Sequence, residues 1–204
     1  TTFFKNTSLL EIAVKSANLS NFKNDIILLT DNRDTAKLKD NFKKVSSLIR
    51  PIFLSSKFIS DQELISYVVK EQEKNNKIYD LVVSIKETYP FREKNLINKM
   101  INSMIKNNYD TIIAAKYEER NIWKVKTNAK AKISLDNFVP RDLKDHKNLI
   151  SLFGLCCITR GWTIKTGDIF KNKNVGIYEV KNSLSSIEVR NNSGFKLINK
   201  LNKL

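Results

Sequence analysis

The sequence predicts an α/β fold in which a mainly parallel sheet is covered by helices on both faces. Two observations predict it: three short apolar runs rich in β-branched residues, and a helix-like segment before each run. The runs span residues 26–29, 81–85 and 111–115, and an aspartate precedes each of them. Continuous apolar runs of this length are typical of strands buried on both faces. Helices that alternate with such strands indicate parallel strands joined by right-handed crossovers.

The helices are expected over residues 8–19, 61–76 and 93–108, because apolar residues recur there at helical spacing. The C-terminal segment has a different order. A short apolar stretch predicts a strand over 185–189, a turn follows it, and a final helix is expected over 195–204.

Residues 116–180 are irregular in pattern. An apolar run over 152–158 resembles a strand, and the segment around it predicts a small, partly antiparallel arm. The part over 116–150 is a candidate dimerisation arm. The chain has neither a Pro/Gly-rich linker nor a repeat of solenoid period, so residues 1–204 are expected to form one domain.

The chain is strongly basic, with 36 Lys and Arg against 21 Asp and Glu and a formal net charge of +15. These cations are spread along the whole chain. Such spreading is more typical of solvated helix faces than of a nucleic-acid-binding patch. We therefore do not expect nucleic acid as a partner. A positive field also suits small anions such as a triphosphate or an acidic sugar.

The sequence argues against a membrane protein. It has no run of about 18 apolar residues, and its first residues lack the pattern of a signal peptide. Cys156 and Cys157 are adjacent, so neither an ordinary disulfide nor a C-x-x-C metal site is expected from them. We expect them to pack as small apolar side chains in a buried strand, which suits a cytoplasmic location.

Ligands of such sheets bind beyond the carboxyl ends of the strands. The first segment in this position is Thr30-Asp31-Asn32, which follows the first apolar run. Thr30 and Asp31 either line a ligand site or cap the helix that follows. The sequence leaves both alternatives open.

The second segment in this position is KETYPFR, residues 86–92. Thr88 and Arg92 either contact a ligand or form a cap and a turn that Pro90 shapes. Lys86 either binds an anionic group or is solvated. Both segments together predict a ligand site at one edge of the sheet.

The order of these motifs resembles that of the acylneuraminate cytidylyltransferases and related CMP-sugar synthetases. That family carries a strand ending in STD, an RP pair, a QPTSPLR segment, an RQ pair and an SIDID segment. The corresponding residues here are Thr30-Asp31, Arg50-Pro51, residues 86–92, Pro140-Arg141 and residues 186–190. No single motif is specific, but the collinear series extends over nearly the entire chain. The resemblance implies a nucleotide-diphospho-sugar transferase-like fold.

The resemblance also implies a reaction. CMP is transferred from CTP to an acidic sugar, sialic acid or a relative used in lipopolysaccharide or capsule biosynthesis, with release of pyrophosphate. The implied partners are CTP and the acidic sugar, the implied cofactor is Mg²⁺, and a homodimer is expected. We expect polar and cationic side chains in the matching motifs to bind the substrates, without assigning a catalytic residue. These are Thr30, Asp31 and Thr88 for the nucleotide, and Lys86, Arg92 and Arg141 for the sugar.

The metal site departs from the family pattern. The two aspartates of the family's DID project from alternate strand positions toward a divalent ion. They correspond here to Glu188, a candidate Mg²⁺ ligand, and to Arg190, which replaces the expected second carboxylate. A unit charge about 4 Å from a divalent cation raises the energy by about 8 kcal/mol at an effective dielectric of about 20. Either ordinary catalysis is lost, or Arg190 itself pairs with phosphates.

Two further departures leave the function open. The family's opening strand and ARGGSKR loop have no counterpart after Thr1, and whether they precede it is open. Lys86 and Glu87 replace the family's Gln and Pro. The alternatives are therefore a catalytically degenerate relative that binds nucleotide or sugar or regulates a partner, and a basic nucleic-acid-binding protein, which the charge alone supports.

Overall fold

The computed structural model describes residues 3–4, 7–42, 44–118, 148–171 and 174–201. Two of the regions singled out in the sequence lie outside these ranges. Arg141 is outside them, and so is most of the segment proposed as a dimerisation arm. No helix in the described part of the chain is long and apolar enough to cross a membrane.

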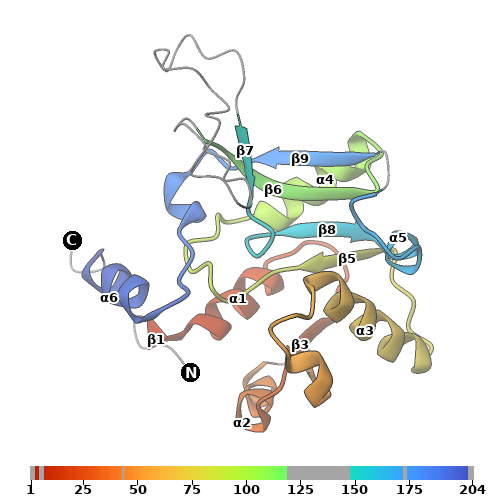
Figure 1. The fold of residues 1–204 in the computed structure, drawn as a ribbon, viewed down its shortest axis with the longest axis horizontal. Helices are drawn as coiled ribbons and strands as arrows, with labels where there is room; N and C mark the ends of the chain where they lie inside the picture. The colour runs from red at the N-terminus through yellow and green to blue at the C-terminus, as the bar shows by residue number, and fades with distance from the viewer. Residues whose placement is uncertain (1–2, 5–6, 43, 119–147, 172–173, 202–204) are drawn as a thin grey trace, which may run out of the picture.

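The described residues form an alternating series of helices and strands (Figure 1). The helices are α1 Leu9–Asn18, α2 Arg33–Ala36, α3 Asp61–Lys74, α4 Leu96–Lys106, α5 Gly161–Lys165 and α6 Asn192–Leu201. The strands are β1 Phe3–Phe4, β2 Thr7–Ser8, β3 Ile26–Thr30, β4 Val45–Ile49, β5 Leu81–Ser84, β6 Thr111–Glu118, β7 Asn148–Ser151, β8 Cys157–Arg160 and β9 Val175–Glu179. Short 3-10 helices include η2 Ile52–Ser55 and η4 Ser183–Ser186.

Local sequence fixes where the two helices α1 and α3 begin. Ser8 accepts a hydrogen bond from the backbone N–H of Glu11, whose carboxylate accepts one from the N–H of Ser8. Ser60 and Glu63 repeat this reciprocal arrangement at the start of α3. Each capping box satisfies two backbone N–H groups that a helix start leaves without partners. The predicted starting points at residues 8 and 61 therefore agree with the structure.

The larger sheet contains both parallel and antiparallel parts. Figure 1 shows β9, β6, β8 and β5 one below the other. β9 is parallel to β6, whereas β8 lies antiparallel between β6 and β5, and β7 is antiparallel to the end of β6. The α/β class is confirmed. The 152–158 run does not form an arm, since only its last two residues lie in a strand, and that strand is central in the sheet.

Helices cover both faces of this sheet, as predicted. On β5, Leu81 and Val83 pack against the core that α4 builds with Met100 and Met104. The residue between them, Val82, packs instead with the apolar side chains of α3 and α5. Alternate residues of a strand point to opposite faces, so α4 and α3 lie on opposite sides of β5.

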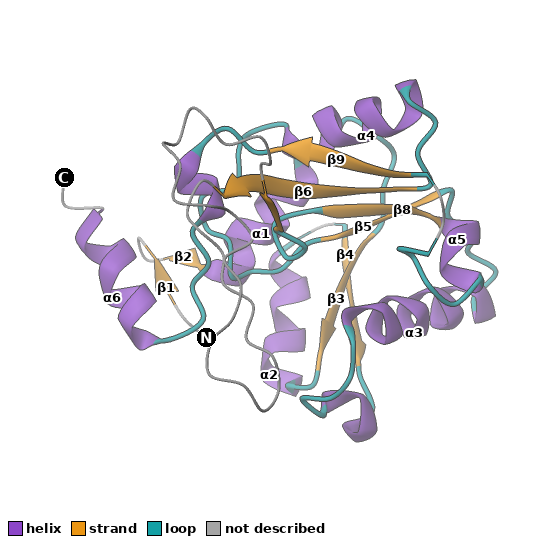
Figure 2. Ribbon diagram, turned by 45° about the horizontal axis from the view of Figure 1, so that its top comes forward, coloured by secondary structure: helices purple, strands orange, loops and turns teal. Residues whose placement is uncertain are grey.

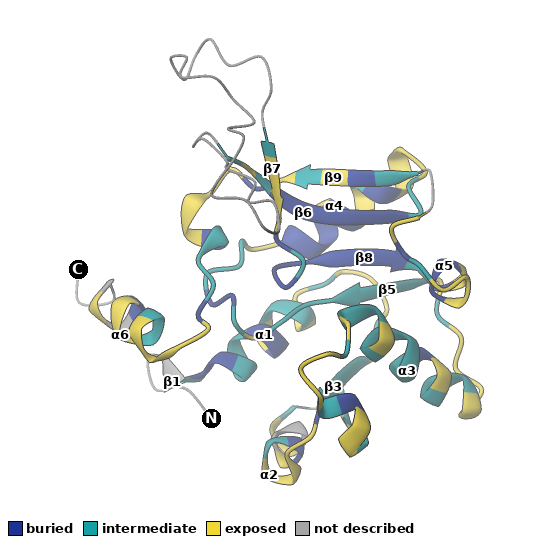
Figure 3. Ribbon diagram, in the orientation of Figure 1, coloured by how far each residue is buried: buried dark blue, intermediate teal, exposed yellow. Residues whose placement is uncertain are grey.

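The strands β3 and β5 are less buried than their apolar runs predict. The residues of β5 and the first four of β3 are only partly buried, whereas the first five residues of β6 and the first three of β8 are buried (Figure 3). The reason is that β3 pairs only with β4 and β5 only with β8 in the described part of the chain. Figure 2 shows β3 and β4 as a separate pair beside the larger sheet.

Side chains connect the two sheets at the starts of β3 and β5. The Tyr79 hydroxyl and the Lys77 ammonium group, both just before β5, donate hydrogen bonds of 2.7 and 2.8 Å to Asp25, just before β3. The Lys77 contact and then the Tyr79 hydrogen bond lower the pKa of Asp25. The Lys77–Asp25 ion pair is about half exposed, so it contributes little to stability.

The C-terminal segment differs from its predicted form. No strand forms over 185–189, because residues 183–186 adopt the 3-10 helix η4 and the residues after it are extended without a ladder. The extended part binds another loop instead: the N–H of Val189 donates to the carbonyl of Thr88 at 2.8 Å. Helix α6 begins at Asn192, three residues before the predicted start.

Both cysteine thiols are expected to resist alkylation in the native protein. Cys156 and Cys157 are buried, and burial raises the pKa of each thiol to about 12. Only the thiolate is an efficient nucleophile. We therefore expect no labelling by iodoacetamide at pH 8 in buffer and two labels per chain in denaturant, as measured by intact mass. Rapid labelling of the folded protein would contradict this packing.

Candidate functional site

Two loops meet beyond the carboxyl end of β5. The first comprises residues 85–92, and the second is the extended segment 187–190 that leads to α6. The hydrogen bond from Val189 to the Thr88 carbonyl holds the two loops together. Phe91 and Ile187 pack against the core shared by α1 and α6. The predicted ligand segment and the predicted metal segment therefore lie side by side.

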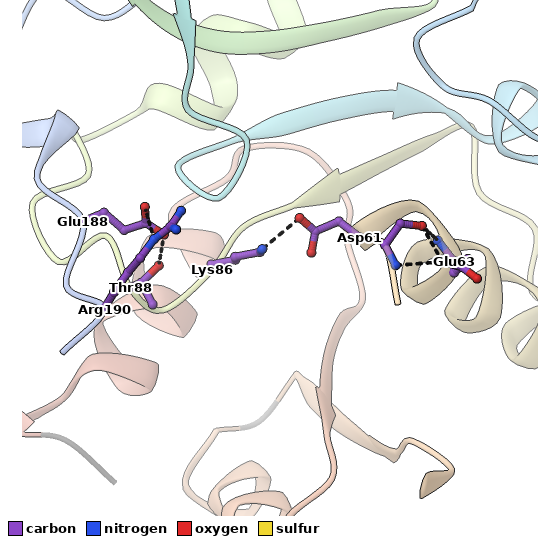
Figure 4. A network of polar contacts seen from close by, with 7 residues as sticks. Asp61, Glu63, Lys86, Thr88, Glu188 and Arg190 are labelled. Carbon is purple, nitrogen blue, oxygen red and sulfur yellow. Dashed lines mark hydrogen bonds and ion pairs between the residues drawn. The ribbon is translucent and has the colours of Figure 1, made fainter. Parts of the chain in front are cut away.

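Glu188 is held by side chains from both loops (Figure 4). The Thr88 hydroxyl donates to one carboxylate oxygen at 3.3 Å, and Nε of Arg190 contacts the other at 2.7 Å. Tyr89 is buried, which together with its interaction with Glu188 raises the pKa of the phenol to about 12. The carboxylate thus has three protein partners.

Lys86 is paired with a residue that the sequence did not single out. Its ammonium group lies 2.8 Å from the carboxylate of Asp61, the first residue of α3 (Figure 4). Both side chains are partly exposed. The backbone beneath is fixed, because the N–H of Lys86 donates to the Gly154 carbonyl at 2.7 Å. Lys86 therefore presents a cation at a defined place on the protein surface.

Gly154 allows the loop to pack closely against its neighbour. A Cβ atom added at this position would lie 2.8 Å from the Tyr89 ring and 3.0 Å from the Lys86 side chain. Such distances are shorter than ordinary van der Waals contacts. A glycine at position 154 therefore has a steric reason.

Arg92 lies beneath this loop, with its guanidinium group largely buried. Its Nε donates to the Leu155 carbonyl at 2.8 Å and its Nη2 to the Lys86 carbonyl at 2.9 Å. Desolvation lowers its pKa. Nη1 has no hydrogen-bond partner among the described residues. Arg92 thus joins the 86–92 loop to the turn before β8, and the geometry favours a positioning role over the predicted contact with a sugar.

Thr30 and Asp31 are not brought into the network around Glu188. Thr30 ends β3, and its hydroxyl accepts a hydrogen bond from the N–H of Asn32 at 3.1 Å. Asp31 forms a 2.6 Å ion pair with Arg50, whose guanidinium lowers the pKa of the carboxyl group. The cap of α2 is Asn32, so neither predicted residue is the helix cap. Their role at a nucleotide stays a prediction.

The residues at the expected metal position do not fit a divalent cation. One carboxylate, Glu188, is already bound by Arg190, and Arg190 has no lone pair to offer. No group of three or more His, Cys, Asp and Glu side chains is placed to hold a metal in the ranges that the structure describes. The contacts of Glu188 therefore argue against Mg²⁺ at this position, while the expectation of Mg²⁺ elsewhere in a nucleotide complex is not tested.

Sequence reasoning missed Asp61 and Tyr89 as members of this site. Asp61 follows a helix cap, where an acidic residue is explained by the helix dipole alone. Tyr89 stands in a loop with no periodic pattern to indicate that it is buried. The sequence carries no signal for either contact, since both depend on which loops meet in space. Arg141 lies outside the described residues.

A separate hollow of about 260 Å³ lies at the opposite end of β5. It is lined by the segment before β5, the end of β8, and parts of α3 and α5, including Tyr79, Asp80, Arg160 and Trp162. Parallel strands present ligands at their carboxyl ends, so this hollow is not the predicted site.

Solved structures with a similar fold include a synthase and a synthetase. A 4-diphosphocytidyl-2C-methyl-D-erythritol synthase from Anaerococcus prevotii is 13% identical, with a TM-score of 0.71 and coverage of 99% of this chain and 88% of that one. A CMP:2-keto-3-deoxy-manno-octonic acid synthetase complexed with CTP is 10% identical, with a TM-score of 0.69 and coverage of 98% and 90%. These similarities show the fold. Comparison with curated proteins finds no match.

The family is shown by comparing the sequence with sequence models of protein families. The sequence model described as cytidylyltransferase matches residues 2–146, which is well over half of the chain. The match includes β3, the Lys86 to Arg92 loop and all of α4. The motif order predicted a cytidylyltransferase, and this match confirms that family. It does not test the specificity for sialic acid. The chain belongs to the cytidylyltransferase family.

Proposed function

We propose that the chain binds CTP and transfers CMP to an acidic sugar, sialic acid or a relative, with release of pyrophosphate. The observation that carries the proposal is the pair of cations at the carboxyl end of β5. Thr88 and Arg190 both contact Glu188, and Lys86 lies two residues before Thr88, in a member of the cytidylyltransferase family (Figure 4). A partly exposed Lys and Arg beside a hydroxyl suit a ligand with phosphate and carboxylate groups.

The proposed reaction is a substitution at phosphorus. A hydroxyl oxygen of the sugar bonds to the α-phosphorus of CTP, the bond from that phosphorus to the bridging oxygen breaks, and pyrophosphate leaves. The hydroxyl proton passes to solvent. The protein contributes position and positive charge near the developing negative charge. A sugar carboxylate would take the place of Asp61 as the partner of Lys86.

Product formation tests this proposal directly. The chain is incubated with CTP and each of several acidic sugars, and ³¹P NMR follows CMP-sugar and pyrophosphate. Equal amounts of the two products with one sugar are expected. CTP without sugar is the control, since it measures simple hydrolysis. No product with any acidic sugar would contradict the transferase proposal.

A second candidate is a relative that binds nucleotide or sugar without transferring it. The contact that favours this candidate is the ion pair between Arg190 and Glu188, which occupies the position of the expected metal ligands. Selective CTP binding without product would support it. The homodimer and the cytoplasmic location are further proposals that the family membership is consistent with but does not test.

Replacing Lys86 by alanine is expected to raise the dissociation constant for the acidic sugar about tenfold. A hydrogen bond to a charged group contributes about 1.5–3 kcal/mol, and about 1.4 kcal/mol corresponds to tenfold. Stability should change little, because both Lys86 and Asp61 are more than a third exposed. Calorimetric titration measures the binding.

The matched control for this prediction is Lys74→Ala. Lys74 also forms an ion pair with a carboxylate, Glu71 at 2.6 Å, but at the far end of α3. Its removal should leave ligand affinity unchanged. Equal effects of the two substitutions would show that Lys86 acts only through the net charge of the protein.

A further inference from the structure

The Arg190 guanidinium stands on the solvent side of the carboxylate that it binds. The Arg190 side chain is 76% exposed, whereas that of Glu188 is 21% exposed. An anion that approaches from solvent therefore meets the guanidinium before the carboxylate. Arg190 has several N–H donors, and its contact with Glu188 is made through Nε. The carboxylate orients a cation whose outer side is open to a ligand.

The backbone around this cation is fixed. Val189, between Glu188 and Arg190, donates its N–H to the Thr88 carbonyl. Its side chain is buried in the core formed with α1 and α6. Residues 188 and 190 are two positions apart on an extended segment, so their side chains leave from the same side. Arg190 consequently points toward the loop of Thr88 and Lys86, as Figure 4 shows.

We propose that Arg190 supplies the positive charge for which related sites would use a divalent cation, and binds the nucleotide phosphates directly. Glu188 holds the guanidinium in place. A guanidinium can bind two phosphate oxygens at once with favourable geometry. Nucleotide binding is then independent of divalent metal. This inference rests on the proposed CTP binding and specifies how the charge is supplied.

Calorimetric titrations of the full chain with CTP, in EDTA and in MgCl₂, test the inference. Binding in EDTA at least as tight as in MgCl₂ is expected. Inorganic tripolyphosphate in EDTA should also bind, because the proposed contact is with the phosphates. Binding that appears only in MgCl₂ would overturn the inference and leave CTP binding intact. Absence of CTP binding in both buffers would overturn the inference together with the proposed function.

The variant Arg190→Asp provides a second readout. It places a carboxylate two positions from Glu188, so we expect the variant to bind Mn²⁺ in the absence of nucleotide, as followed by electron paramagnetic resonance. Its affinity for CTP in EDTA should fall at least tenfold. Arg190→Gln should lose the CTP affinity without gaining Mn²⁺. Unchanged affinity in EDTA for both variants would overturn the role of Arg190.

The control for these variants is Lys106→Ala. Lys106 lies at the end of α4 and is exposed. Removing it lowers the net charge by one unit, as Arg190→Gln does, at a place away from Glu188. CTP affinity in EDTA should be preserved. A loss as large as that of Arg190→Gln would assign the effect to general charge and contradict a specific contact.

Discussion

An Arg92→Leu variant is expected to lose about 3 kcal/mol of unfolding free energy, because each buried group left without a hydrogen bond costs about 1–3 kcal/mol. The guanidinium donates hydrogen bonds to the carbonyls of Lys86 and Leu155. Leucine fills part of the space but donates nothing to either oxygen. The loop that carries Thr88 would lose its attachment to the turn before β8. Urea denaturation monitored by circular dichroism measures the loss.

The substitution Arg92→Lys separates charge from geometry. An ammonium group keeps the charge, but it cannot donate hydrogen bonds to both carbonyls with the geometry of a planar guanidinium. We expect an intermediate loss of stability and weaker CTP binding. Arg190→Ala is the control, since that side chain is 76% exposed and should affect stability little. A stable Arg92→Leu protein would contradict the positioning role.

A Gly161→Ala variant is expected to be destabilised by about 2 kcal/mol or more, since extra atoms in a packed interior typically cost about 1–3 kcal/mol. Gly161 is the first residue of α5 and contacts the residues just before β5. A Cβ atom at this position would lie 2.1 Å from the Tyr79 carbonyl oxygen. The backbone cannot move away easily, because the N–H of Gly161 donates to the Asp80 carbonyl at 2.9 Å.

Gly194→Ala is the matched control for this variant. Gly194 lies in α6, and the nearest atom to an added Cβ is 3.5 Å away, on a side chain. Alanine is favoured over glycine in a helix by about 1 kcal/mol, so this variant should be as stable as the parent or slightly more stable. Thermal unfolding of both proteins compares them. Equal melting temperatures would show that β5 and α5 are less closely packed than described.

The parts of the fold that could be predicted are those that local sequence patterns determine, namely helix starts and short apolar strands. The helices α1 and α3 begin at capping residues, and the runs at 26–29, 81–85 and 111–115 each form a strand. The position of β8 could not be predicted, because a short apolar run does not specify its neighbours or its direction. Nor does the run at 26–29 show that its strand would have a single partner in the described sheet.

The candidate site could be predicted only in part, because the sequence indicates which loops follow strands but not which side chains meet in space. The 86–92 loop was expected at the carboxyl end of a strand, and it lies there beside Glu188 and Arg190. The partner of Lys86 could not be predicted, because Asp61 is distant in sequence and belongs to a helix start. An arginine suits a ligand contact as well as hydrogen bonds to buried carbonyls, so the sequence does not distinguish these roles for Arg92. Its burial in the structure does.

The central claim is that the carboxyl end of β5 forms a CTP site, and nucleotide selectivity tests it most directly. The chain is titrated in a calorimeter with CTP, ATP and GTP in the same buffer. Saturable binding of CTP, at least tenfold tighter than that of ATP or GTP and weakened by Arg190→Gln, is the result that we predict. Equal affinity for all three nucleotides, or binding of none of them, would contradict the claim.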